Sequence, residues 1–283
     1  MISHISDTAR WVAFYRAMET ERPDAIFTDP FARRLAGLHG EEIVDTMRRG
    51  RSMAWAMIVR TAVFDEIILA AVNDKGVDTV LNLAAGLDAR PWRLELPSAL
   101  RWVDVDLPEI LQYKRDSLKG EKLNCLYEAI AADLTDAAPR RALFERIGRE
   151  GKSVLVVTEG LLVYLTAEEV GGLSQDLSQQ PSFRWWLIDL ASPRLLAIMK
   201  RSWGHEVEKG NAPFKFAPPE GTSFFRPFGW REAEFRSSLE EAHRLRREMK
   251  MMWLWRLIGQ ISGSKRRAEM RRMSGIVLLE RAG

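Results

Sequence analysis

A chain of 283 residues, of which 46% are hydrophobic and 29% charged, can bury one sizeable core, so we expect a single domain over residues 1–283. Its one cysteine, Cys125, excludes an intramolecular disulfide, a CxxC redox motif and a multi-cysteine zinc site, and we expect no bound metal. The formal net charge of only +3 argues against a nucleic-acid partner, although residues 226–283 carry +7 and the rest of the chain −4.

Residues 1–75 are predicted to form a helical cap. Ala13 and Ala17 recur at helical spacing, as do Ile58 and Ala62, and no strand pattern interrupts these segments. Neither the start of the chain nor any later stretch has the apolar run of a signal peptide or a membrane span. We therefore expect a cytoplasmic protein without a transmembrane segment.

Across residues 76–195, short apolar segments alternate with helical ones. The predicted strands are VDTVLNL (77–83), RWVDVDL (101–107), LYEAIAADL (126–134), KSVLVVTEG (152–160) and FRWWLIDL (183–190). A helix should begin at Pro108, and another should cover residues 166–179, where Thr166 and Glu169 have the spacing of a capping box. This rhythm indicates an α/β protein with an open, doubly wound sheet.

The last third of the chain is less regular. Residues 196–229 are rich in proline, glycine and aromatic residues, and we interpret them as an ordered loop or lid. The part 230–283 is predicted to hold helices, the first over 230–242, and a closing strand over 274–283. The lid aromatics either line an apolar acceptor site or form a small core of their own, and they are Phe214, Phe216, Phe224, Phe225, Phe228 and Trp230.

The segment 249–272 mixes aromatic, aliphatic and basic residues. An amphipathic helix packed on the domain before the last strand is the preferred interpretation, because Trp253 and Trp255 do not form a one-sided helical stripe. Binding to a membrane surface or an acidic partner is the alternative.

Glycine and acidic residues follow the predicted strands. Gly86 follows the first strand, Asp106 the second, Asp133 with Leu134 the third, and Glu159 the fourth. Ligands of open parallel sheets bind at these carboxyl ends, where a glycine permits close backbone approach and an acid accepts ribose hydroxyls. Taken one by one, Gly86 could be a structural turn residue and Asp133 a helix N-cap.

Asp104 lies within the second strand, where it could be a polar edge residue or the partner of a helix. Asp106 is preferred as the ribose ligand because it is nearest the strand end. The chain lacks both GxGxxG and a phosphate-binding GKS or GKT motif. A nucleoside ligand is therefore favoured over a dinucleotide or ATP hydrolysis.

Ordered blocks of this chain resemble the leucine carboxyl methyltransferase family, in particular its bacterial branch of O-methyltransferases that use S-adenosylmethionine (SAM), some of which act on polyketide acids. The resemblance covers about residues 6–190 and rests on SDTARWVAFYRAMETERPDAIFTDPFARRLAG, IVRTAVFDEII, LNLAAGLDARPWRL, VDVDLPEILQYKR, AADLTD and VVTEGLLVYLTAEEV. It implies the class I methyltransferase fold, a Rossmann-like seven-stranded sheet with a reversed last strand, N-terminal helices and an insertion.

The resemblance also implies roles for single residues. Arg16 and Arg60 would pair with the SAM carboxylate, although either could instead be an ion-paired surface residue. Gly86 would lie under the methionyl and ribose parts, and Asp106 would bind the ribose hydroxyls.

Asp133 and Leu134 would frame the adenine. Glu159 would lie near the methionyl amino group or the acceptor, and Tyr164 either points its hydroxyl at the acceptor or fills the core.

The chain departs from the family's GAGLDTR pattern in its first strand turn. Its residues 84–90 read AAGLDAR, so Ala84 replaces the first glycine and Ala89 the threonine. We expect weaker SAM binding from the extra methyl group of Ala84, without loss of the site.

The expected reaction is transfer of a methyl group from SAM to an oxygen of a small molecule, leaving S-adenosylhomocysteine. A carboxylate needs no general base at neutral pH, whereas a phenol does. The four histidines lie outside the strand ends, and only His205, in the lid, is worth testing as a base. The lack of an evident base favours a carboxylate acceptor on a small molecule. The alternative acceptor is a protein C-terminal carboxylate. The alternative functions are a non-catalytic SAM or nucleotide module and a nicotinamide oxidoreductase. A homodimer is compatible with the sequence.

Overall fold

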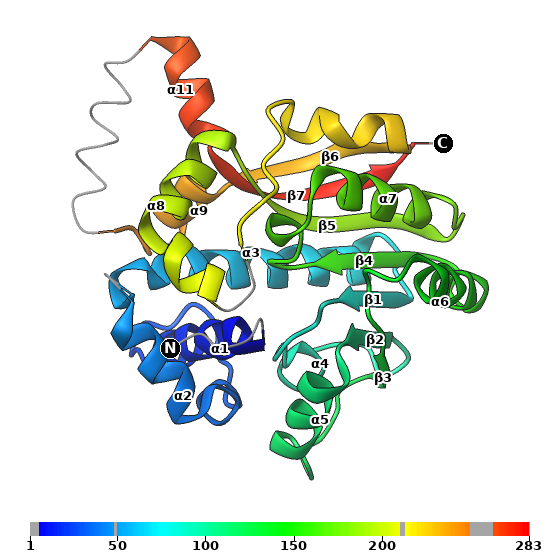
Figure 1. Ribbon diagram of the computed structural model, residues 1–283. Helices are drawn as coiled ribbons and strands as arrows, with labels where there is room; N and C mark the ends of the chain where they lie inside the picture. The colour runs from blue at the N-terminus through cyan, green and yellow to red at the C-terminus, as the bar shows by residue number, and fades with distance from the viewer. Residues whose placement is uncertain (1–5, 48–49, 210–212, 250–262, 283) are drawn as a thin grey trace.

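The computed structural model describes residues 6–47, 50–209, 213–249 and 263–282. Its seven-stranded sheet has the order β3-β2-β1-β4-β5-β7-β6 (Figure 1). The first five strands run parallel, and β7 runs antiparallel to both β5 and β6. The strands are β1 (Thr79–Leu83), β2 (Arg101–Asp106), β3 (Leu126–Ala131), β4 (Val154–Thr158), β5 (Phe183–Ala191), β6 (Trp230–Ser237) and β7 (Ser274–Arg281).

Helices cover both faces of this sheet and one of its ends. They are α1 (Ser6–Thr20), α2 (Ala32–Thr46), η1 (Arg51–Met53), α3 (Ala54–Asp74), α4 (Arg90–Arg93), α5 (Pro108–Ser117), α6 (Ala137–Glu150), η2 (Leu162–Tyr164), α7 (Ala167–Ser178), α8 (Pro193–Lys209), η3 (Gly221–Phe228), α9 (Ser238–Arg244) and α11 (Ser264–Arg271). Helix α5 begins at Pro108, and Thr166 with Glu169 forms a complete capping box on α7, as predicted. Among the helices described, none combines the length and apolar character needed to cross a bilayer.

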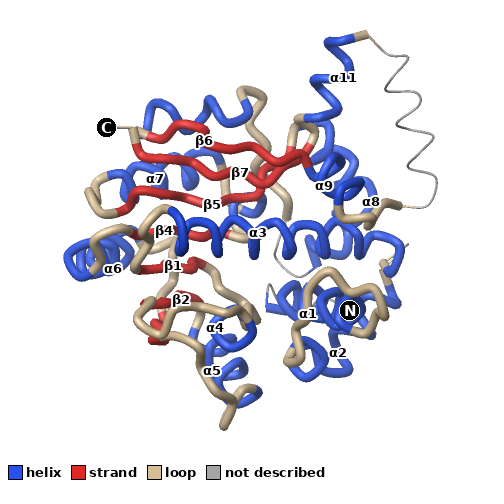
Figure 2. The backbone as a smooth tube through the Cα atoms, turned by 180° about the vertical axis from the view of Figure 1, so that it is seen from behind, coloured by secondary structure: helices blue, strands red, loops and turns tan. Residues whose placement is uncertain are grey.

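The central strands are apolar on both sides because both faces of the sheet are covered. In β4, Val154 and Val156 belong to the core on one face, whereas Leu155 and Val157 belong to the core on the other. Helices α6 and α7 with η3 cover the first face, and α3 with α9 covers the second (Figure 2). The alternation confirms the doubly wound α/β architecture.

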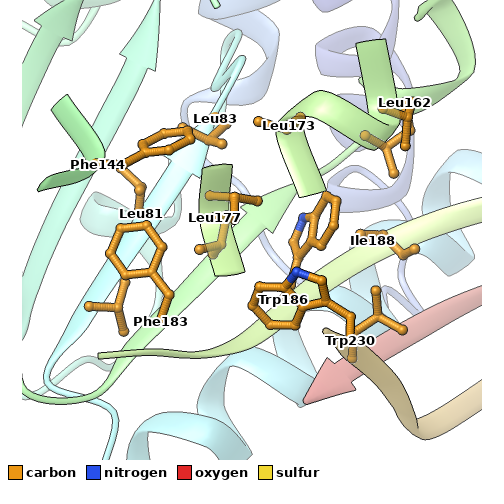
Figure 3. Packing of buried hydrophobic residues seen from close by; sticks show 14 of the residues in the cluster. Leu81, Leu83, Phe144, Leu162, Leu173, Leu177, Phe183, Trp186, Ile188 and Trp230 are labelled. Atoms are coloured by element: carbon orange, nitrogen blue, oxygen red, sulfur yellow. The ribbon is translucent and has the colours of Figure 1, made fainter. Parts of the chain in front are cut away.

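Two buried tryptophans organise the core beneath α7 and η3. The rings of Trp186 and Trp230 lie 5.5 Å apart in an edge-on arrangement (Figure 3). Each indole nitrogen has a partner, since Trp186 donates to Thr158 Oγ1 and Trp230 donates to the Ser174 carbonyl, both at 3.0 Å. Both tryptophans are fully buried, so this part of the sheet is a rigid support for the neighbouring strand ends.

The N-terminal helices cover the carboxyl ends of the parallel strands. Helices α1 and α2 pack on each other through a buried cluster that also includes Leu87, after β1, and Ile110, of α5. Figures 1 and 2 show these helices and α8 at the same end of the molecule. Any ligand bound at the strand ends is therefore enclosed by segments that are far apart in the sequence.

Two predictions for the last third were wrong. Residues 230–237 form the edge strand β6 rather than the start of a helix, which begins only at Ser238. Pairing with β7 outweighs the helix propensity of the glutamates, alanine and arginines in this segment. Part of the predicted lid is helical, because α8 begins at Pro193 and extends to Lys209, while residues 213–229 follow as a loop and η3. Most of the predicted amphipathic helix, residues 250–262, lies outside the described residues.

Candidate active site

A cavity of about 1240 Å³ lies at the carboxyl ends of the parallel strands. It is lined by residues that follow β1 to β5, by α1 and α3 of the N-terminal cap, and by α8 and the loop after it. The residues that were given roles in binding SAM or in positioning the acceptor all line it, namely Arg16, Arg60, Gly86, Asp106, Asp133, Leu134, Glu159 and Tyr164. The fold thus brings residues between positions 16 and 164 of the sequence to the wall of one cavity.

Gly86, in the turn after β1, is hydrogen-bonded to Asp106, the last residue of β2. Gly86 has a φ of +50°, and a Cβ added there would lie 3.3 Å from the Cβ of Ala9. Its N–H donates to Asp106 Oδ2 at 2.6 Å, and the Leu107 N–H donates to Oδ1 at 2.7 Å. Each carboxylate oxygen keeps acceptor capacity for one more donor. Burial raises the pKa of Asp106 above its usual value, against the opposing effect of these two N–H groups.

Ala84, which stands where the family pattern has glycine, has a φ of +52°. A left-handed backbone costs a residue with a Cβ about 1–2 kcal/mol, part of which glycine would recover. We expect Ala84→Gly to increase the free energy of unfolding by about 1 kcal/mol in urea denaturation. Ala85→Gly, at a neighbouring residue outside the positive-φ region, should instead decrease it; equal destabilisation by both would contradict the strain.

Arg60, on α3, is held between two acids from different strands. Its Nε lies 3.0 Å from Glu159 Oε1, after β4, and its Nη1 lies 3.3 Å from Asp189 Oδ2, on β5. Burial lowers the pKa of Arg60, but the charges of Asp189 and Glu159 outweigh burial and raise it above its ordinary value. Its Nη2 has no hydrogen-bond partner among the described residues, and Arg60 is part of the cavity lining, so this nitrogen keeps donor capacity for an anion.

Glu159 is a fixed anion rather than a free base. Its Oε1 accepts from Arg60, and its Oε2 accepts from Arg90 Nη1 at 2.8 Å. Burial raises the pKa of Glu159, but Arg90 and Arg60 together lower it below its usual value. Glu159 therefore stays ionised at neutral pH and orients the Arg60 guanidinium.

Arg90 connects this pair to a buried ionic network. It is 2% exposed and contacts Asp65, Asp88 and Glu159 at 2.6, 2.7 and 2.8 Å. Arg93 shares Asp65 with it. The network joins α3, the β1 turn and the β4 turn, which fixes the strand-end residues relative to one another.

Asp88 makes this network sensitive to acid. Burial raises the pKa of Asp88, but Arg90, Lys114 and Arg93 outweigh burial and hold the pKa at about 2, below the ordinary 3.8. A lowered carboxyl pKa contributes stability that is present above pH 4 and is lost as the pH falls toward 2. Thermal unfolding between pH 6 and pH 2 should show Asp88→Asn less stable than wild type at pH 6, with the difference shrinking below pH 4. A constant difference would contradict the ionic role.

Arg16 is ion-paired, yet buried in the cavity lining rather than on the surface. Its Nε lies 2.8 Å from Asp29 Oδ2, and its Nη2 donates to the Leu87 carbonyl at 2.6 Å. Arg16 therefore ties α1 to the turn after β1. Its predicted contact with a cofactor carboxylate stays a prediction.

Asp133 and Leu134 lie beyond β3, at the end of the cavity remote from β5. Asp133 is exposed, and its Oδ1 accepts from the N–H and the hydroxyl of Thr135. The alternative reading of Asp133 as the helix N-cap was wrong, because Asp136 caps α6. Asp104 proved to be the partner of a helix, through Lys114 of α5.

Tyr164, of η2, packs against the loop after α8. Its ring stacks on Phe214 with centroids 5.7 Å apart, and burial raises its pKa to about 12. The phenol therefore keeps its proton at neutral pH and can donate a hydrogen bond into the cavity that it lines. Phe214 and Phe216 line the cavity as well, whereas Phe225 belongs to the core under the sheet. Phe225 thus belongs to the main core rather than to a separate small one, and the role of the lid aromatics in binding an acceptor stays a prediction. The side chain of His205 lies outside the described part of α8.

Three cavity-lining features escaped the sequence reasoning. Asp189, at the end of β5, accepts from the Gly160 N–H at 2.6 Å and pairs with Arg60. The strand-end rule that selected Asp106 and Glu159 would have found it in FRWWLIDL. Thr61 Oγ1 and Trp55 Nε1, on α3, are buried without a hydrogen-bond partner in the described structure, and no sequence pattern signals an unpartnered atom.

The chain is similar in sequence to a family of methyltransferases. The leucine carboxyl methyltransferase family model matches residues 9–177. Two relatives, each named "Putative S-adenosyl-L-methionine-dependent methyltransferase", come from Parafrankia sp. (strain EAN1pec) and Rhodococcus jostii (strain RHA1). The first is 35% identical over 185 residues, 62% of this chain and 59% of the relative. The second is 36% identical over 174 residues, 58% of both chains. The chain thus spans about three fifths of the length of the curated relatives it matches.

A solved structure, that of a DUF574 family protein from Streptomyces avermitilis, covers 97% of both chains with a TM-score of 0.64 at 13% identity. It therefore shares the fold. Together with the family match, the observed strand order and the reversed β7, this confirms the predicted class I methyltransferase fold.

Proposed function

Because the chain belongs to the leucine carboxyl methyltransferase family, as its sequence blocks predicted, we propose that it is a SAM-dependent O-methyltransferase acting on the carboxylate of a small molecule. The observation that carries this proposal is the cavity at the strand ends, which is lined both by charged strand-end residues and by apolar side chains. Such a space suits a polar cofactor beside an apolar acceptor.

The residues present fit SAM. The positive φ of Gly86 and the lack of a Cβ there permit close approach to the backbone, and Asp106 can accept from two ribose hydroxyls. Arg60 Nη2 is available for the methionyl carboxylate, with Arg16 in support. Leu134 is partly buried and apolar, as an adenine contact requires, with Asp133 beside it. The unpartnered hydroxyl of Thr61 supplies a further polar atom in the cavity lining.

When bound, SAM would supply an electrophilic methyl group on its sulfonium sulfur; transfer would form a bond from the acceptor oxygen to the methyl carbon, break the carbon–sulfur bond and leave S-adenosylhomocysteine. The protein must chiefly hold the two partners in line and exclude water. An acceptor carboxylate, with a pKa of about 4, is already ionised at neutral pH and needs no base. Glu159 positions Arg60, and protonated Tyr164 can donate to the acceptor carboxylate and orient it.

Transfer of radiolabelled methyl from SAM to a panel of carboxylic acids, phenols and a peptide ending in leucine tests the proposal. We expect products from the small acids that release their label in mild alkali, as methyl esters do, and no product with Asp106→Ala. Alkali-stable products from phenols alone, or labelling of the peptide alone, would refute the carboxylate assignment. Binding of SAM without transfer to any acceptor would favour a non-catalytic module.

A further inference from the structure

Methionines gather around the candidate site. Eight methionines lie in the described part of the chain, and all of them except Met18 line the cavity. Roughly one in five of the described residues lines it, so an even distribution would place about two methionines there. The concentration is therefore a property of this cavity rather than of the composition.

Four of these methionines lie toward the β5 side of the cavity, where an acceptor would bind. Met199 is on α8, which follows β5, and Met273 directly precedes β7 next to the end of β5. Met53 and Met57 come from η1 and the first turn of α3, and Figures 1 and 2 place that end of α3 beside α8. Asp133, beyond β3, lies four strand positions from β5 in the sheet, so the adenine end and the methionines are well separated.

A methionine lining has a physical consequence for recognition. The side chain is unbranched, has three rotatable bonds and carries a polarizable sulfur, so it adapts to ligands of different outline. Protein surfaces that accept several partners often use such side chains, because they repack at low cost. Leu195 and Ile198 of α8 extend the same apolar surface, and Phe214 adds an aromatic ring.

Exposed arginine side chains also line this part of the cavity. Arg194 and Arg201 of α8 and Arg266 of α11 line the cavity and are exposed, and none has an ion pair or hydrogen bond within the described chain. The arginines deeper in the site, such as Arg60 and Arg90, are paired with acids. Unpaired cations at the solvent-facing part of a cavity attract anionic ligands.

We infer that this site methylates apolar carboxylic acids of more than one shape, and that the methionine lining selects its acceptors by apolar bulk rather than by a single outline. The inference rests on the proposed function and names its substrate class. Aliphatic, cyclic and aromatic acids of similar size should all be acceptors, whereas short acids should be poor ones.

The test measures kcat/KM for octanoic, 4-phenylbutanoic and 4-cyclohexylbutanoic acids and for butanoic acid, all with the same reacting group. For the wild type we expect the three large acids to agree within about tenfold, and butanoic acid to fall at least about tenfold below them. Met57→Ile and Met199→Ile, which introduce stiff β-branched side chains, should widen the spread among the large acids to more than about tenfold. The affinity for SAM should not change.

Met18→Leu, outside the cavity, is the matched control and should keep the wild-type pattern, and melting temperatures identify a variant that fails to fold. A wild type that prefers one large acid about 100-fold over the others, or equal use of butanoic acid, would overturn this inference and leave the proposed function intact. An unchanged spread in folded isoleucine variants would also overturn it. Transfer to no acid at all would refute the proposed function and this inference with it.

Discussion

Replacing Arg60 by alanine is expected to weaken SAM binding about 100-fold, because charge-assisted hydrogen bonds of a guanidinium to a carboxylate are worth up to about 3 kcal/mol. The loss has a second source. Without Arg60, the methionyl carboxylate would face the Glu159 and Asp189 side chains with no counter-charge from this arginine. The measurement is the KM for SAM in methyl transfer, together with the dissociation constant from equilibrium dialysis.

Two variants separate the binding role of Arg60 from a general loss of charge. Arg60→Lys keeps the charge but loses the planar fork that pairs with two acids, so an intermediate defect is expected. Arg33→Ala removes an arginine that also pairs with two acids, Glu21 and Glu41, but on the surface of α2, and it should leave the affinity unchanged. Wild-type affinity in a folded Arg60→Ala variant would remove Arg60 from the cofactor site.

Replacing Lys114 by methionine is expected to decrease the free energy of unfolding by about 3–5 kcal/mol, since it leaves a buried carboxylate without its counter-charge. The Lys114 ammonium lies 2.8 Å from Asp104 Oδ2, and the two side chains are 1% and 0% exposed. Asp104 also accepts from Asn82 at 3.0 Å, from Trp102 at 2.9 Å and from Tyr127 at 2.8 Å. The pair fixes α5 against β2, two residues before Asp106 at the end of that strand.

Urea denaturation checks this prediction, with Lys119→Met as the control. Lys119 lies just after α5 and is exposed, so its replacement should change the stability by less than about 0.5 kcal/mol. The double variant Asp104→Asn, Lys114→Met removes both charges and should be less destabilised than the two single effects added together. A loss below about 1 kcal/mol in Lys114→Met would show that the pair is not needed for stability.

The sheet could be predicted from the sequence where burial dictates the pattern. Strands such as VLVVT, buried on both faces, leave only one interpretation, and the capping box at Thr166 marks the start of α7 by local chemistry alone. Strand β6 could not be predicted in this way. Its residues, WREAEFRS, favour a helix locally, and only pairing with β7, almost forty residues away in the sequence, makes them a strand.

The residues of the candidate site also fall into two groups, those that the sequence predicts and those that depend on tertiary packing. Gly86, Asp106 and Glu159 follow from the rule that ligands bind beyond the carboxyl ends of parallel strands, and the structure brings them together. The position of Arg60 came from the family resemblance, and its pairing with Asp189 depends on the packing of α3 across β5. The methionine lining could not be predicted from the sequence, because Met57 and Met199 line one cavity only where the cap and α8 pack at the same strand ends.

Calorimetric titration of the purified protein with SAM tests the account most directly, with Asp106→Ala for the ribose contact and Asp116→Ala as an exposed acid of α5 outside the cavity. The account predicts a dissociation constant on the order of micromolar for wild type and Asp116→Ala, and a loss of at least about 100-fold for Asp106→Ala. A folded wild-type protein that does not bind SAM, or an Asp106→Ala variant that binds it as tightly as wild type, would contradict the assignment of this cavity as the cofactor site.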